Sequence, residues 1–144
     1  MKKQGGFTVI EMAGLLVLVG ILAAIAIPEI TSLRMHYRQH EAKHNLKIIK
    51  KLEASYYAVN KRYTPSLKVL GWAPAAGSLY EYSVGTDKAG NPDPGGSPAG
   101  NRPAFANTSG FNAVAWGNID LDPVIDTWEI SDSYDLRNTS NDNN

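Results

Sequence analysis

The chain of 144 residues contains no cysteine. This absence excludes disulfides, cysteine-ligated zinc sites and thiol catalysis. The run from Met12 to Pro28 has no charged side chain, and no glycine-rich phosphate loop follows a predicted strand. The net charge is zero, but residues 1–62 hold ten Lys and Arg against four Asp and Glu, and residues 63–144 hold four against ten. We expect a basic stem and an acidic, soluble head, a distribution that does not indicate nucleic-acid binding.

A single carboxylate, Glu11, stands at the start of the apolar run. An ionisable side chain within a membrane segment costs roughly 2.5 to 3.5 kcal/mol on insertion scales. It therefore needs a positively charged partner. The leader before it reads MKKQGG, and a cut after Gly6 would place a new amino terminus on Phe7, one helical turn from Glu11. Such a pair can form between two chains.

The stretch GFTVIEMAGLLVLVGILAAIAIPEI resembles the processing site and apolar stem of type IV pilins. The matching features are a short basic leader ending in Gly6, then Phe7, Glu11 four residues later, and Pro28 at the end of the apolar run. The resemblance covers residues 1 to about 60. It implies that a prepilin peptidase cuts between Gly6 and Phe7 and methylates the Phe7 amine. It also implies that Glu11 neutralises the Phe7 amine of a neighbouring subunit, with Phe7, Glu11 and Pro28 as assembly residues.

The resemblance implies a structural subunit and no enzyme. The subunit is stored in the inner membrane as a single-span precursor and polymerises with itself into a helical fibre on the bacterial cell surface. Its other partners would be an inner-membrane assembly platform and cytoplasmic motor ATPases, because the chain has no nucleotide site of its own. Many type IV pilins close their C-terminal region with a disulfide, and this chain departs from that pattern.

Four other interpretations remain open. A pseudopilin of a type II secretion machine has the same stem. A secretory signal peptide ending at Ala24-Ile25-Ala26 would release a soluble domain that starts near Ile27. A plain single-span anchor explains the length of residues 7–28 but not Glu11. The sequence His40-Glu41-Ala42-Lys43-His44 matches the H-E-x-x-H pattern of zinc peptidases, in which two imidazoles bind zinc and the glutamate activates water.

Two arguments weigh against a zinc peptidase. The pattern lacks a third ligand, and no folded domain precedes this helix to form the other wall of a pocket. His36, His40 and His44 recur at four-residue spacing, so the imidazoles share one side of the helix, where they could bind adventitious metal or change charge near neutral pH. An exposed polar stripe or a contact between subunits accounts for the same residues and is favoured.

The rest of the chain predicts an α+β fold, in which a long N-terminal helix packs against a small antiparallel sheet. We expect a cleaved leader over 1–6, an apolar helix over 7–28 that bends or melts locally near Pro28, an amphipathic helix over 29–63 and a head over 64–144. The predicted apolar face of the second helix comprises Ala42, Leu46, Ile49, Leu52, Tyr56, Val59 and Tyr63, and Glu41 and Glu53 are assigned to the solvated side. Strands are predicted at 79–84, 111–116 and 124–130, with a long exposed loop over 85–103 and a loosely ordered tail over 131–144.

The predicted turn between the last two strands carries a candidate calcium site, and no other cofactor is required. Its oxygen donors fall at places one, three, five, nine and twelve of an EF-hand-like loop. They are Asn118, Asp120, Asp122, Asp126 and Glu129. Pro123 stands where such a loop has glycine. A polar hairpin turn without an ion accounts for the same residue types.

Overall fold

The computed structural model describes residues 6–100, 102–120 and 123–140, and for residues 26–32 it describes the backbone alone. The helix α1 runs from Val9 to Asn60, and its helical assignment continues across Pro28. The local melting predicted near Pro28 is therefore wrong. The chain divides into two compact units, residues 1–34 and residues 35–144, so α1 contributes to both.

In the first unit, the apolar side chains of α1 have no cover. Leu15, Leu16, Val17 and Leu18 follow one another around the helix, and each is more than half exposed. Four successive residues point to all sides of a helix, so the uncovered apolar surface surrounds it. Within the described residues, no helical stretch is both long enough and apolar enough to cross a membrane.

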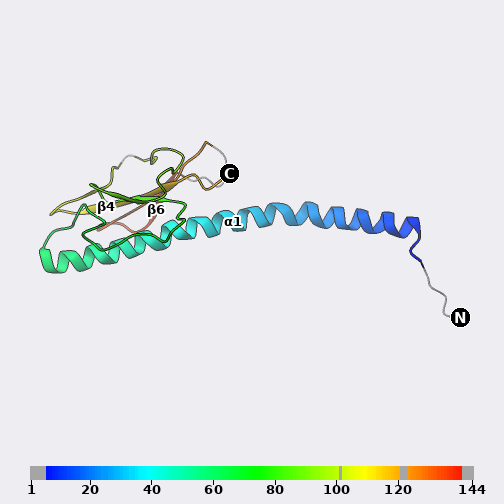
Figure 1. Cartoon of the computed structure of the whole chain (residues 1–144), viewed down its shortest axis with the longest axis horizontal. Coiled ribbons are helices and arrows are strands. Elements are labelled where there is room, and N and C mark those ends of the chain that lie inside the picture. Colours follow the sequence, from blue (N-terminus) through cyan, green and yellow to red (C-terminus); the bar gives the residue numbers. More distant parts are fainter. Residues whose placement is uncertain (1–5, 101, 121–122, 141–144) are drawn as a thin grey trace. The chain divides into compact units, whose positions relative to one another are not determined.

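The second unit holds an antiparallel sheet with the strand order β2-β1-β4-β5-β6, and β3 also pairs with β4. The strands are β1 (Glu81–Ser83), β2 (Lys88–Gly90), β3 (Phe105–Ala106), β4 (Phe111–Gly117), β5 (Asp126–Ser131) and β6 (Arg137–Ser140). Figure 1 shows the strands beside the C-terminal half of α1. The predicted α+β arrangement is confirmed, and β1, β4 and β5 lie where strands were predicted.

The core lies between α1 and one face of this sheet. Ala42, Leu46 and Ile49 are fully buried there, as predicted. They share one hydrophobic cluster with side chains of β1, β4 and β5, namely Tyr82, Phe111, Ala113, Ala115, Trp128 and Ile130. Beyond Ile49, Leu52 and Tyr56 are half-buried and Tyr63 packs against the core, in line with the prediction. The prediction is wrong for Val59, which is 82% exposed, and for Glu53, which is buried.

The segment before β3 covers the opposite face of the sheet. Trp116 on β4 is only 3% exposed, although it does not belong to the core cluster on the helix side. The amide of Ala99 donates to Thr127 Oγ1 (3.1 Å), and Asn112 Nδ2 donates to the Pro103 carbonyl (3.2 Å). The exposed loop predicted over 85–103 is therefore wrong in two respects, because the loop contains β2 and its later part covers β4 and β5.

The C-terminal region is held by strand pairing. Residues 137–140 form β6 along β5, so the prediction of a loosely ordered tail is wrong for these residues, while 141–144 lie outside the described residues. Asn138 Nδ2 donates to Asp126 Oδ1 (3.0 Å), and Thr139 Oγ1 donates to the Ala99 carbonyl (3.0 Å). A ladder and two side-chain bonds thus anchor the end of the head in a chain without cysteine.

Glu53 is the acid that the helix buries at its C-terminal end. Its Oε2 accepts a hydrogen bond from the Thr64 amide (3.1 Å), and its Oε1 has no partner among the described residues. Burial raises the pKa of Glu53 from 4.5 to about 7, although the Thr64 hydrogen bond acts to lower it. A raised pKa means that the fold favours the protonated acid. Its contribution to stability is therefore complete below pH 4.5 and is lost as the pH rises through about 7.

The substitution Glu53→Gln tests this burial. The amide keeps an oxygen acceptor for Thr64 and cannot ionise. We expect the wild-type head to lose roughly 1 to 3 kcal/mol of stability between pH 5 and pH 8 through this group. The variant should lose correspondingly less, as measured by thermal unfolding of the full chain in detergent. Asp93→Asn, the matched change at an exposed acid, should leave the dependence of stability on pH unchanged. If the stability of Glu53→Gln changes with pH as much as that of the wild type, buried Glu53 is not the group responsible.

Candidate functional site

Thr8 and Glu11 form a reciprocal cap at the start of α1. The Thr8 amide and hydroxyl both donate to Glu11 Oε2 at 2.7 Å, and the Glu11 amide donates to Thr8 Oγ1 at 3.3 Å. This is a capping box, in which the residue before the helix and the third helical residue each satisfy the other's amide. The sequence pattern Thr-x-x-Glu is typical of such a cap. The sequence analysis did not predict the cap, although this pattern is present. Glu11 therefore has partners inside its own chain.

The predicted cleavage junction lies directly before this cap. Phe7 is 80% exposed and precedes Thr8, whose amide already contacts the Glu11 carboxylate. A Cβ added to Gly6 would meet no atom within 4 Å, so packing does not require glycine there. The predicted processing residues are thus accessible, and an amine released on Phe7 would arise one residue from an atom that Glu11 binds. Nothing is described of residues 1–5 or of the Pro28 side chain.

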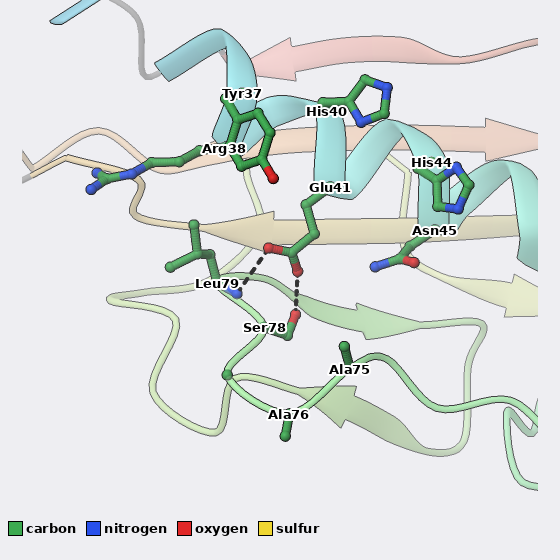
Figure 2. A pocket seen from close by; sticks show the side chains of 11 residues that line it. Tyr37, Arg38, His40, Glu41, His44, Asn45, Ala75, Ala76, Ser78 and Leu79 are labelled. Atoms are coloured by element: carbon green, nitrogen blue, oxygen red, sulfur yellow. Dashed lines mark hydrogen bonds between the residues drawn. The ribbon is translucent and has the colours of Figure 1, made fainter. Parts of the chain in front are cut away.

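Within the H-E-x-x-H pattern, all three of His40, Glu41 and His44 line one pocket beside the 75–79 segment, but only the Glu41 side chain bonds to that segment. Glu41 Oε1 accepts from Ser78 Oγ (2.5 Å), and Oε2 accepts from the Leu79 amide (3.3 Å). Figure 2 shows Glu41 turned toward the 75–79 segment, and His40 and His44 turned away from it. In the described ranges, no three His, Cys, Asp or Glu side chains gather as metal ligands would. The glutamate of the pattern joins the helix to the head, which does not favour the zinc-peptidase interpretation.

Asp126 is a fully buried hydrogen-bond acceptor. Its Oδ2 accepts from Tyr80 Oη and Trp128 Nε1, both at 2.5 Å, and its Oδ1 accepts from Asn138 Nδ2 (3.0 Å) and Gln39 Nε2 (3.3 Å). Burial, followed by the bond to Asp126, raises the pKa of Tyr80, so its hydroxyl stays protonated as a donor. One carboxylate thereby joins α1, β5, β6 and Tyr80, the residue directly before β1.

Two of the five predicted calcium ligands have other partners in the structure. Asp126 faces Gln39 of α1, while Glu129 Oε2 accepts from Tyr134 Oη (3.1 Å). Asn118 and Asp120 lie in the connection after β4, and Asp122 lies outside the described residues. Calcium binding at this turn stays a prediction.

These observations define a class of protein before any comparison. A helix with an uncovered apolar first part, a sheet packed on its second part and a capped acid beside an exposed junction form a pilin-like subunit.

Comparison with known proteins supports this class. The chain is similar to the type IV major pilin protein PilA of Myxococcus xanthus, with 38% identity over 82 residues. The match covers 57% of this chain and 37% of the relative, so the chain spans little more than a third of the relative's length. No protein-family model matches the chain. The predicted resemblance to type IV pilins is confirmed by this relative.

The substitution Asp126→Asn distinguishes a buried acceptor from a calcium ligand. The amide nitrogen of Asn would face groups that are themselves hydrogen-bond donors. We expect this to lower the free energy of unfolding by about 2 to 4 kcal/mol. The loss should be equal in calcium and in chelator, as measured by unfolding of the full chain in detergent. Asp135→Asn, at an exposed acid, should change stability by less than about 0.5 kcal/mol. A loss for Asp126→Asn that appears only in calcium would show that Asp126 binds the ion.

Proposed function

We propose that this chain is a structural subunit of a type IV pilus, which polymerises with itself into a helical fibre on the cell surface. The observation that carries the proposal is the uncovered apolar surface around the first part of α1, next to the capped Glu11. Water disfavours this surface by about 25 cal/mol for each Å² exposed. Lipid or the stems of other subunits would cover it. The name of the curated relative supports a pilin rather than any other membrane-anchored protein.

The proposed life cycle begins in the inner membrane. The precursor is held there by residues 7–28, with its basic leader on the cytoplasmic side and its acidic head outside. A prepilin peptidase cuts after Gly6 and methylates the Phe7 amine. The exposed junction and the absence of any packing reason for Gly6 support this step.

Assembly then moves the apolar stems from lipid into the core of the fibre. Contacts of this head-to-tail kind propagate as a helix when the rotation between subunits does not close a ring. The Phe7 amine of one subunit and Glu11 of its neighbour set the axial register by their opposite charges. Pro28 lacks an amide hydrogen and weakens the helix at the end of the apolar run, which lets stems adjust as they pack.

The cap at Thr8 gives this charge pairing a defined geometry. Two donors of Thr8 hold one oxygen of Glu11, so the carboxylate enters the fibre already oriented. The Phe7 amine would add a charge-assisted bond, which is stronger than a neutral one. An assembly platform and cytoplasmic motor ATPases supply the energy for extension. A pseudopilin of a type II secretion machine remains the alternative, and abundant long fibres would distinguish a pilin from it.

Mass spectrometry of the amino terminus tests the processing step. Protein isolated from its host should begin at Phe7 and carry one methyl group on the amine. A start near Ile27 would show instead that residues 1–26 are a secretory signal peptide. An intact Met1 on protein recovered from fibres would refute cleavage.

Two substitutions separate the charge of Glu11 from its role as a cap. Glu11→Gln keeps an oxygen for the Thr8 donors and removes the charge, so we expect normal insertion and at least about tenfold fewer fibres, which corresponds to about 1.4 kcal/mol. Thr8→Ala removes the hydroxyl and keeps the charge. It should weaken the helix start by about 1 kcal/mol and still allow fibres.

Sheared fibres are counted by electron microscopy and compared with the cleaved subunit in membranes. Fibres at wild-type levels from Glu11→Gln would contradict the charge pairing without excluding a pilin. Equal losses in both variants would assign Glu11 to the cap alone.

A further inference from the structure

The two histidines of the H-E-x-x-H pattern form a pair that the proposed function does not use. The rings of His40 and His44 stack with centroids 6.1 Å apart and planes 13° from parallel. Both side chains are exposed, and both lie in the unit formed by residues 35–144. Figure 2 shows the two rings on the same side of α1. Residues four apart on a helix are neighbours on its surface, so their ring nitrogens can reach one ion.

Three charged side chains near this pair, those of Lys43, Arg38 and Glu41, make contacts with the head. Lys43 Nζ lies 4.4 Å from the centre of the Trp128 ring, and Arg38 Nη1 donates to the Ile119 carbonyl. Glu41 lines the same pocket as His40 and His44, and its carboxylate accepts hydrogen bonds from Ser78 Oγ and the Leu79 amide. Two nearby cations that would repel a metal ion are therefore engaged with the head, and the imidazoles face solvent.

From this geometry we infer that His40 and His44 chelate a divalent first-row transition ion. Imidazole is a ligand for zinc, copper and nickel, and two imidazoles at i and i+4 bind from one helix face. Small rotations of two exposed side chains would bring one nitrogen of each ring to about 2.0 Å from the ion. Water fills the other coordination positions. Among such ions Cu²⁺ binds most tightly to a given nitrogen site.

The pairing of these two residues, rather than of His36 with His40, follows from their present arrangement. Their rings already lie side by side, so less side-chain freedom is lost on binding. The inference does not depend on fibre formation, because both ligands belong to one chain.

Titration with Cu²⁺ tests the inference on the full chain in detergent. We expect one Cu²⁺ per chain by calorimetry at pH 7.5 in a buffer that does not coordinate metal, and nitrogen ligation in the electron paramagnetic resonance spectrum. His40→Ala and His44→Ala should each weaken binding at least about tenfold. His36→Ala should change it by less than about threefold.

A variant with the same number of histidines controls for nonspecific binding. His44→Ala combined with Lys51→His keeps three imidazoles and removes the pair, so it should bind as weakly as His44→Ala. Binding that survives both His40→Ala and His44→Ala would place the ion elsewhere, such as at the amino terminus. A loss in His36→Ala as large as in His44→Ala, or the absence of binding at about 100 μM Cu²⁺, would also overturn the inference.

Discussion

The packing of Ala42, Leu46 and Ile49 against the sheet is the contact on which the head depends. These three residues fill the space between α1 and the side chains of β1, β4 and β5. A sheet of such short strands needs a covered face to be stable, and the helix provides it. The buried face of α1 also includes two polar side chains, Gln39 before Ala42 and Glu53 after Ile49. These two side chains need hydrogen-bond partners because they are removed from water.

Two buried acids, Asp126 and Glu53, hold segments of the head together by hydrogen bonds in a chain that has no disulfide. Asp126 receives donors from α1, β5, β6 and Tyr80 just before β1, so one carboxylate joins the helix to two strands and to the entry of a third. Glu53 binds the Thr64 amide and fixes the point at which the chain turns back from the helix. Polar groups buried with such partners hold segments in one arrangement, and they cost stability when a partner is removed.

The two parts of α1 differ in how much of their apolar surface is covered. Its second part is covered by the sheet, whereas its first part has apolar side chains all round and no cover within its unit. A fold that uses one helix both as core element and as uncovered apolar stem favours a subunit that is completed by other copies. The cap between Thr8 and Glu11 then places the acid that precedes the apolar run at the start of the helix, close to Phe7.

The sequence by itself determined the long helix, the resemblance of its first part to pilins and the position of β1, β4 and β5. These features depend on local hydrophobic periodicity and on a contiguous motif, which can be identified without the structure. The Thr-x-x-Glu cap was also readable from local spacing. Only the tertiary structure decided that Glu53 and Asp126 are buried, that the described residues of the segment before β3 cover the second face of the sheet and that residues 137–140 form β6. Each of these depends on a donor or strand far away in the chain, and polar residues carry no local pattern that identifies such partners.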